Sequence, residues 1–208
     1  MEHHNLMDSR FFSIFTRLAD LILLNFIFLL SCLPIITIGA SCAALYQVAA
    51  SMADNRESYI LRSYLAEWKK NFKQGTLVWV LCVIMLILCR VNLSILPSMP
   101  PGFTKVFLAC FQFGTLFILY GLLLYCFSMP LIYKAAFGSM IKNALVLLFK
   151  YLPHTLLCLC VHALPFAAAI LAPRWAGLVL SIVMAAGFST AAYIQSRILL
   201  HVYKKQRS

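Results

Sequence analysis

Long apolar runs, separated by short polar segments, dominate the chain. A helix that spans the hydrocarbon core of a bilayer needs about 20 predominantly apolar residues, and five runs reach that length. The pattern therefore predicts an all-α, polytopic transmembrane helical bundle in which residues 1–208 form a single membrane domain. The five predicted crossings are Leu18–Thr37, Gly75–Leu96, Lys105–Pro130, Tyr151–Ala172 and Trp175–Leu199.

For a sixth segment, Ile38–Ala53, the pattern does not show as clearly whether it crosses the membrane. It reads IGASCAALYQVAASMA, so it is short and consists mostly of small residues. Pro34 and Gly39 at its start suit a sharp turn of the chain. Periodicity does not decide whether this segment spans fully or is a tight re-entrant return, so the prediction is five to six crossings.

The distribution of charge favours a return by this segment. The chain holds 17 Lys and Arg against 6 Asp and Glu, and its formal net charge is +11. Basic residues of multi-pass membrane proteins collect in cytoplasmic loops. If Ile38–Ala53 brings the chain back, fourteen of the 17 basic residues share one side of the membrane; if it does not, the bias collapses. We therefore expect both termini to be cytoplasmic.

Composition excludes several classes of protein. Hydrophobic residues make up 63% of the chain and charged residues 11%, whereas a soluble domain has about 45–50% and about 25%. The chain is therefore neither a soluble domain nor disordered, since disorder requires low hydrophobicity. The basic excess is explained by topology, so the expected partner is the lipid bilayer and no nucleic-acid partner is expected.

Residues 54–74 have a pattern of their own. Apolar residues recur at helical spacing, while basic residues fall largely elsewhere on the same helix. This predicts an amphipathic helix on the cytoplasmic surface, and two interpretations remain open. The helix lies among headgroups with its basic residues on anionic lipid, or it docks a protein partner. The apolar positions are Leu61, Tyr64, Leu65, Trp68 and Phe72.

Small residues recur every four positions in two of the predicted crossings. In a bilayer this spacing lets two helix backbones approach closely, so we predict helix-packing interfaces there. The interfaces lie either inside the monomer or against a partner subunit. The residues are Gly177, Ser181, Ala185 and Ser189 in one segment, and Gly39, Ala40, Ala43 and Ala44 in the other.

Two polar residues occur in the first predicted crossing. Asp20 follows Arg17 by three positions, which predicts an ion pair at the cytoplasmic mouth of the helix. Asn25 lies deeper and predicts a hydrogen bond to another helix.

Histidine and cysteine form one regular pattern. His154, Cys158 and His162 follow i, i+4, i+8 spacing along one side of a helix. The pattern allows a soft-metal path, a proton relay, or histidines that only bond neighbouring helices. All eight cysteines lie inside predicted crossings, where cysteine serves as a small apolar residue. No metal or cofactor is expected.

Sequence motifs of catalysis and energy coupling are missing. The chain contains no GxxxxGK[ST] phosphate loop and no HExxH, GxSxG or CxxC pattern. No carboxylate follows Glu67, which argues against paired-carboxylate hydrolysis in the remainder. We therefore expect no enzyme activity.

Short stretches between residues 18 and 79 carry a resemblance to a known family. They are Leu18–Leu21, Asn25, Leu33–Ala40, Ala44–Tyr46 and Asn71–Gln74. Together they resemble the YesL-like family of bacterial integral membrane proteins, which is grouped as a domain of unknown function. Members are commonly encoded beside carbohydrate-uptake ABC transporters. The resemblance therefore implies the bacterial cytoplasmic membrane and a link to sugar import, and it implies no catalytic residues.

These observations lead to three functional hypotheses. The first is an accessory membrane subunit of a carbohydrate ABC importer, with the permease subunits as partners. The second is a small transporter or channel that acts as a homo-oligomer, with His154 and His162 lining its path. The third is a membrane-embedded regulator or chaperone.

Overall fold

A computed structural model describes residues 2–54, 59–128, 137–171 and 173–207, with side chains placed for residues 15–165 and 167–199 within these ranges. The described part is helical and contains no strand. The α-helices are α1 Glu2–Ser31, α2 Ile38–Ala53, α3 Ile60–Ile95, α4 Phe103–Ser128, α5 Phe137–Lys150, α6 Leu152–Leu171, α7 Ala176–Ile182 and α8 Phe188–Arg207. Short 3₁₀ turns cover Ile35–Thr37, Leu96–Ser98 and Pro173–Trp175, and a π-helical turn, η5, covers Val183–Gly187.

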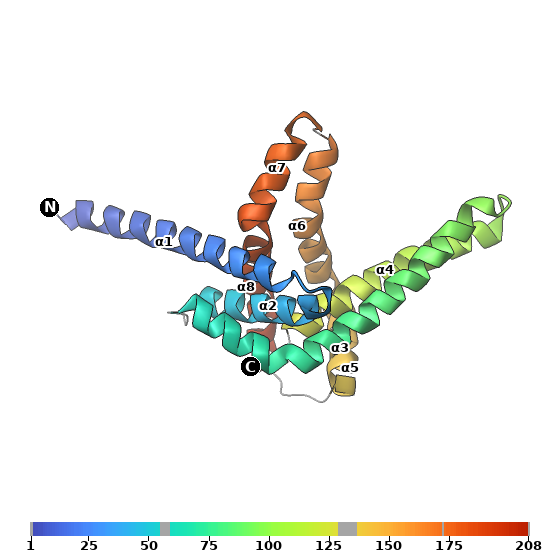
Figure 1. Ribbon diagram of the computed structural model, residues 1–208, viewed down its shortest axis with the longest axis horizontal. Helices are drawn as coiled ribbons and strands as arrows, with labels where there is room; N and C mark the ends of the chain where they lie inside the picture. The colour runs from blue at the N-terminus through green and yellow to red at the C-terminus, as the bar shows by residue number, and fades with distance from the viewer. Residues whose placement is uncertain (1, 55–58, 129–136, 172, 208) are drawn as a thin grey trace.

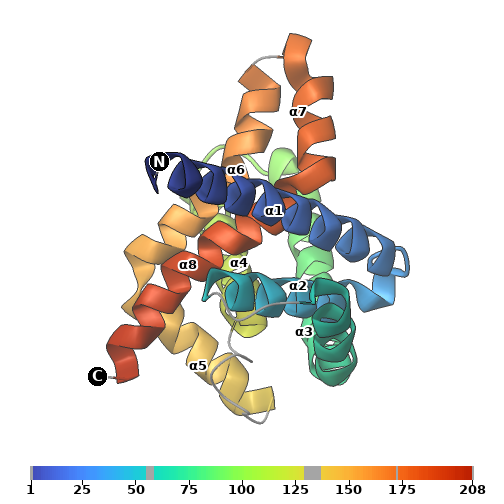
Figure 2. The ribbon, with the colours of Figure 1, turned by 90° about the vertical axis from the view of Figure 1, so that its left-hand side faces the viewer.

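Helix α2 is the centre of the molecule. Twelve of its 16 residues are buried, and α3, α8, α4 and α1 all pack against it (Figures 1 and 2). Its small side chains allow this, because helices can approach a surface of Gly, Ala and Ser from several directions without meeting bulky side chains. The segment that was hardest to interpret from sequence is therefore the core of the fold.

The closest helix contact lies between α2 and α3, at Gly39 and Gly75. A Cβ atom added to Gly39 would lie 2.1 Å from the Gly75 carbonyl oxygen. A Cβ atom added to Gly75 would lie 2.8 Å from the Gly39 carbonyl oxygen and 2.9 Å from the Ala40 Cα. Both positions therefore require glycine, because backbone atoms occupy the space that a side chain would need.

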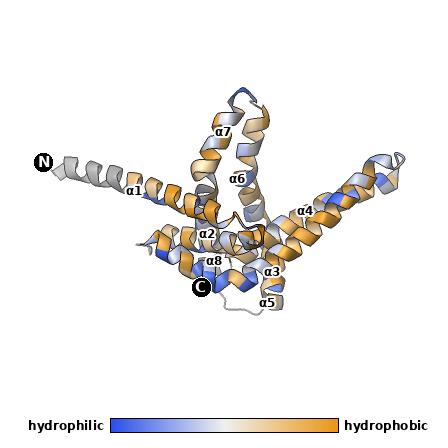
Figure 3. Cartoon of the chain, in the orientation of Figure 1, coloured by the Kyte–Doolittle hydropathy of each residue, from blue (hydrophilic) through white to orange (hydrophobic). Residues whose placement is uncertain are grey.

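Two helical hairpins leave this centre as separate arms. One consists of α3 and α4 and the other of α6, α7 and η5, and they point in different directions (Figure 1). Hydrophobic residues run along both arms (Figure 3), and many of their large apolar side chains are exposed. Strongly exposed examples are Ile87, Leu88, Phe107, Phe111, Leu164 and Ile170.

The exposed apolar surface is that of a membrane protein. Within the described residues, five helical segments are long and apolar enough to cross a bilayer. They are Ile35–Ala53, Ile60–Ser98, Phe103–Ser128, Leu152–Leu171 and Pro173–Leu199. The all-helical, membrane-spanning class predicted from sequence is therefore confirmed.

The first predicted crossing, Leu18–Thr37, is wrong at its carboxyl end. Helix α1 stops at Ser31, because Pro34 has no N–H to donate and its ring clashes with the preceding helical turn. Side chains hold the resulting turn together. The Thr37 hydroxyl donates to the Ser31 carbonyl at 2.7 Å, and the Ser41 hydroxyl donates to the same carbonyl at 3.1 Å.

The predicted boundary at Gly75 is also wrong. The amphipathic segment and the following crossing are one continuous helix, α3, of 36 residues. At about 1.5 Å per residue such a helix is roughly 54 Å long, which exceeds the hydrocarbon thickness of about 30 Å. Gly75 lies inside this helix, where the absence of a side chain allows the close approach to α2.

Candidate functional site

The π-helical turn η5 interrupts the long helix formed by α7 and α8. The side chain of Asn25 of α1 bonds backbone groups at this turn. The Asn25 Nδ2 donates to the Met184 carbonyl at 2.7 Å, and the Ser189 backbone N–H donates to the Asn25 Oδ1 at 3.1 Å. A π-helical turn disturbs the regular i to i−4 pairing of its backbone groups. The single amide of Asn25, which is fully buried, supplies a partner to one carbonyl and one N–H at this turn.

Further contacts hold α1 across α8 at the same place. The Ser189 hydroxyl donates to the Leu21 carbonyl at 2.7 Å, and the Phe28 and Phe188 rings lie 5.6 Å apart. Figure 2 shows α1 crossing in front of α8. The predicted hydrogen bond from Asn25 to another helix is therefore confirmed.

Two charged residues of α1, Arg17 and Asp20, precede this crossing. Arg17 donates through Nη1 to the Tyr193 hydroxyl at 2.9 Å, and Asp20 lies half-buried one turn further on. An ion pair between Arg17 and Asp20 stays a prediction.

A second buried junction joins four helices through the side chain of Gln195 in α8. The Tyr46 hydroxyl of α2 donates to the Gln195 Oε1. The Gln195 Nε2 donates to the Cys158 carbonyl of α6 at 3.0 Å and contacts His162 Nδ1. The Tyr120 hydroxyl of α4 lies 3.1 Å from the same His162 nitrogen. We call this set of side chains, Tyr46, Tyr120, His162 and Gln195, the polar junction.

The hydrogen-bond arrangement assigns a state to His162. Because the Gln195 amide can only donate through Nε2, His162 Nδ1 acts as an acceptor, and the ring proton then lies on Nε2. This is a neutral histidine that bonds neighbouring helices. Of the three interpretations of the histidine pattern, the hydrogen-bonding one is the one that these contacts support for His162.

His154 does not join the polar junction. Its Nδ1 is buried and has no hydrogen-bond partner among the described residues, and its ring lies edge-on to Tyr151 at 5.9 Å. Within the described part of the chain, no three His, Cys, Asp or Glu side chains come together as a metal site. The i, i+4, i+8 spacing therefore places His154, Cys158 and His162 on one helix without gathering them around a common point.

A cavity of about 240 Å³ adjoins the polar junction. It lies between α6 and the helix that contains η5, and its lining is almost entirely apolar. Among the described residues that line it, His162 is the only ionisable one. Thr190, the other polar side chain, donates to the Ala186 carbonyl at 2.6 Å. The lining also includes Pro165, Val183, Phe188 and Ile194.

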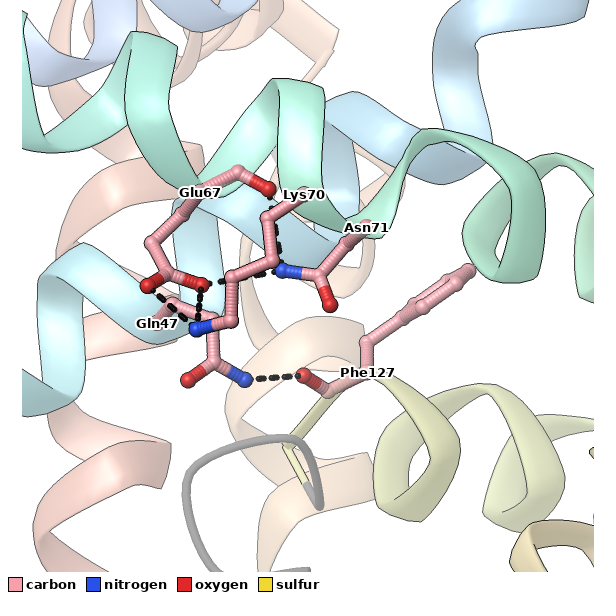
Figure 4. Close-up of polar contacts among 5 residues, drawn as sticks. All are labelled: Gln47, Glu67, Lys70, Asn71 and Phe127. Carbon is pink, nitrogen blue, oxygen red and sulfur yellow. Dashed lines mark hydrogen bonds and ion pairs between the residues drawn. The ribbon is translucent and has the colours of Figure 1, made fainter. Parts of the chain in front are cut away.

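A third polar cluster lies where α2, α3 and α4 meet (Figure 4). Gln47 donates to the Phe127 carbonyl at 3.2 Å, near the end of α4. On α3, the Glu67 carboxylate accepts from Lys70 at 2.7 Å and from Asn71 at 3.0 Å. Gln47 thus satisfies a carbonyl in the last turn of α4, where the helix itself provides no partner, and Glu67 is bound by its own helix.

The two predicted small-residue interfaces have different surroundings. Gly39, Ala40, Ala43 and Ala44 are all buried in α2, so they pack inside the monomer. Gly177, Ser181 and Ala185 are exposed, and only Ser189 of that series is buried.

The predicted docking residues of α3 also differ in burial. Tyr64 is fully buried, and its hydroxyl bonds the Ser31 hydroxyl at 2.5 Å. The Trp68 indole N–H donates to the Ser41 hydroxyl at 3.3 Å. These two side chains serve internal contacts, Tyr64 with the end of α1 and Trp68 with α2. Leu61 and Leu65 are exposed, and Phe72 is half-buried.

Sequence reasoning did not single out the polar junction or the π-helical turn. Gln195 was the available signal, because it is the one amide side chain in the predicted crossing Trp175–Leu199, where a polar side chain needs a partner. Its partners Tyr46 and Tyr120 come from distant helices, and their spacing in the sequence carries no signal of the contact.

One family model matches a segment in the amino-terminal half of the chain. Residues 21–93 match the family model described as "Protein of unknown function, DUF624". The YesL-like family is part of DUF624, so the resemblance predicted from sequence is confirmed. No curated protein and no solved structure matches the chain.

The DUF624 segment covers the last third of α1, all of α2 and most of α3. It therefore contains Asn25, Gly39, Tyr46 and Gly75, which make the central contacts of the fold. The groups that Asn25 and Tyr46 bind, at η5 and Gln195, lie outside the matched segment.

Proposed function

We propose that the protein is an accessory membrane subunit that binds transmembrane helices of a partner and has no catalytic activity of its own. The partner in this proposal is the permease of a carbohydrate ABC importer in the bacterial cytoplasmic membrane. Both termini of the chain face the cytoplasm. The proposal combines a structural argument for partner binding with the family resemblance, which supplies the carbohydrate importer.

The observation that carries the proposal is the outward face of α7. A Cβ atom added to Gly177 would meet nothing within 4 Å beyond its immediate surroundings in the helix, and Ser181 of α7 and Ala185 of the adjoining turn η5 are also exposed, at four-residue spacing. Inside a bilayer, helices associate through close backbone approach, because lipid offers no hydrophobic driving force between them. A smooth exposed face in the membrane therefore favours a second helix as its neighbour.

The separation of the arms supports the same role. The α3–α4 arm and the α6–α7 arm diverge from the centre, so each presents apolar surface on more than one side (Figure 1). The turns at the arm tips carry Lys105 and Arg174, while most basic residues lie in elements nearer the centre. This distribution supports the proposed orientation, because the basic-rich side is the cytoplasmic one.

Purification of the full chain from its native membrane in a gentle detergent, followed by quantitative mass spectrometry, tests the proposal. We expect ABC permease and ATPase subunits in stoichiometric amounts. Ala185→Ile should remove them while the chain itself stays folded. Ala167→Ile is the matched control, because Ala167 is also exposed but lies on α6. A chain that purifies without these subunits, or that keeps them in Ala185→Ile, contradicts the proposal.

A second candidate is a small transporter that acts as a homo-oligomer, and the cavity beside His162 favours it. The cavity places one ionisable side chain against an otherwise apolar lining. This candidate predicts sugar-dependent flux into liposomes that contain only the purified chain. It also predicts that His162→Gln lowers the flux. Absence of flux in liposomes where the chain is folded rejects this candidate.

A further inference from the structure

The amino-terminal half of α3 has three distinct faces. One face packs on α2 through Ile60, Tyr64 and Asn71, which are all buried. The second, beside it, carries the apolar residues Leu61 and Leu65, whose side chains are 53% and 45% exposed. An interfacial helix of this kind, with an exposed apolar face, lies at the boundary between acyl chains and headgroups.

The third face is basic. Arg62, Lys69 and Lys73 follow i, i+7, i+11 spacing, so they share one side of the helix, and all three are exposed. The carboxylate of this segment does not oppose them. Glu67 lies on another side of the helix and is bound by Lys70 at 2.7 Å and by Asn71 at 3.0 Å.

We propose that Arg62, Lys69 and Lys73 bind the anionic headgroups of phospholipids in the adjacent leaflet. The neighbouring apolar face would enter the acyl boundary, so that the half-helix lies along the membrane surface while the face with Ile60, Tyr64 and Asn71 packs on α2. The charge of the face matches an anionic lipid, and a polybasic segment beside a bilayer gains affinity from each Lys or Arg. This inference depends on the membrane location alone and is independent of the proposed partner.

Lys70 provides an internal control. It belongs to the same helix and is exposed, but its ammonium group is paired with Glu67 at 2.7 Å. Replacement of Lys70 removes the same formal charge as replacement of Lys69 or Lys73. A site formed by one face of the helix distinguishes these substitutions, whereas a general effect of net charge does not.

The test uses the fluorescence of Trp68, which lies in the same segment. In a Trp79→Phe, Trp175→Phe background, Trp68 is the remaining tryptophan. The full chain is reconstituted in vesicles of phosphatidylcholine and phosphatidylglycerol in which one lipid carries brominated acyl chains. The ratio of quenching by the two brominated lipids reports which lipid lies next to Trp68.

We expect stronger quenching by brominated phosphatidylglycerol than by brominated phosphatidylcholine, and a preference that weakens at high salt. Each charge removed from the basic face should lower the relative affinity about fivefold, so Arg62→Gln, Lys69→Gln, Lys73→Gln together should abolish the preference. Lys70→Gln should change it less than twofold.

Three results would overturn the inference. They are equal quenching by the two lipids, a preference that survives the triple substitution, and an equal loss in Lys70→Gln. If the triple variant keeps its lipid preference but loses the importer subunits on purification, the face binds a protein instead. Loss of the lipid preference with the subunits retained separates this inference from the proposed function.

Discussion

Helices α2 and α7 both present small residues at four-residue spacing, yet their surroundings are opposite. In α2 the small residues are enclosed by α1, α3, α4 and α8. In α7 they face outward, and a side chain at Gly177 would enter open space. The shared pattern predicts that a helix can be approached closely. It does not predict whether the approaching helix belongs to the same chain.

The difference follows from what surrounds each pattern. Tyr46 and Gln47 of α2 reach to other helices, where they bind Gln195 and the Phe127 carbonyl. The corresponding part of α7 consists of Leu, Val and Ile, and its Ser181 hydroxyl donates to the Gly177 carbonyl of its own helix. A helix with polar side chains that reach outward is held inside the protein. A helix whose polar groups are satisfied internally can face lipid or a partner.

The largest effect is expected from a bulky residue at the α2–α3 contact. Gly75→Leu would place its side chain among backbone atoms of Gly39 and Ala40 at 2.8–3.0 Å. The helices would have to separate, so we expect loss of the folded chain, measured as loss of the monodisperse peak in detergent. Gly114→Leu is the control, because a Cβ atom at Gly114 meets nothing within 4 Å. A Gly75→Leu variant that stays monodisperse would show that the fold does not require the close contact between α2 and α3 at Gly75.

Asn25→Leu is expected to have the next largest effect. It leaves the Met184 carbonyl and the Ser189 N–H without the partners that Asn25 supplies. Each buried unsatisfied group costs about 1–3 kcal/mol, so for the two groups thermal unfolding in detergent should show a destabilisation of about 2–6 kcal/mol.

The Asn25→Leu variant also tests whether the contact at η5 fixes the orientation of α7. If the π-helical turn relaxed to regular α-helix, α7 would rotate by one residue, or about 100°, and its small-residue face would turn with it. Cysteine crosslinking between α6 and α7 would detect this rotation. Unchanged stability together with unchanged crosslinks would contradict the role assigned to Asn25.

Tyr46→Phe should cost less. It removes the hydroxyl that donates to the Gln195 Oε1, while the ring continues to pack in the core. A single hydrogen bond of this kind contributes about 0.5–1.5 kcal/mol, and we expect a decrease in stability in that range. Tyr193→Phe is the comparison variant. Tyr193 lies in α8, two residues before Gln195, and its hydroxyl accepts from Arg17 outside the polar junction. A larger loss in Tyr193→Phe than in Tyr46→Phe would mean that the polar junction does not hold the helices together.

The smallest effect on the isolated chain is expected at Ala185. The residue is exposed, and substitutions at exposed positions usually change stability by less than about 0.5 kcal/mol. Ala185→Ile should therefore unfold at nearly the same temperature as the unmodified chain in the same detergent. A clear drop in that temperature would show that Ala185 packs against the rest of the chain, as the small residues of α2 do.

Much of the fold could be predicted from the sequence, because helix length and hydropathy depend on local composition. The starts and ends of α4 and α6 were predicted within about two residues where the structure describes them. Asn25 was also identified correctly, since an amide within an apolar run needs a partner.

Other features depend on contacts between distant residues and could not be predicted. Glycine is typical of a helix boundary, but Gly75 lies inside α3 and contacts Gly39, 36 positions earlier. Gln195 joins helices that contain Tyr46 and His162, and no local pattern marks this meeting. The surroundings of the two small-residue series likewise depend on the whole fold.

A pair of glycine-to-alanine substitutions tests the contrast between α2 and α7 most directly. Alanine favours a helix over glycine by up to about 1 kcal/mol, so the same added methyl group has an intrinsic benefit at both sites. We predict that Gly177→Ala raises or maintains the unfolding temperature of the isolated chain. Gly39→Ala should lower it, because its Cβ would lie 2.1 Å from the Gly75 carbonyl oxygen. Changes of the same sign in the two variants would contradict the account.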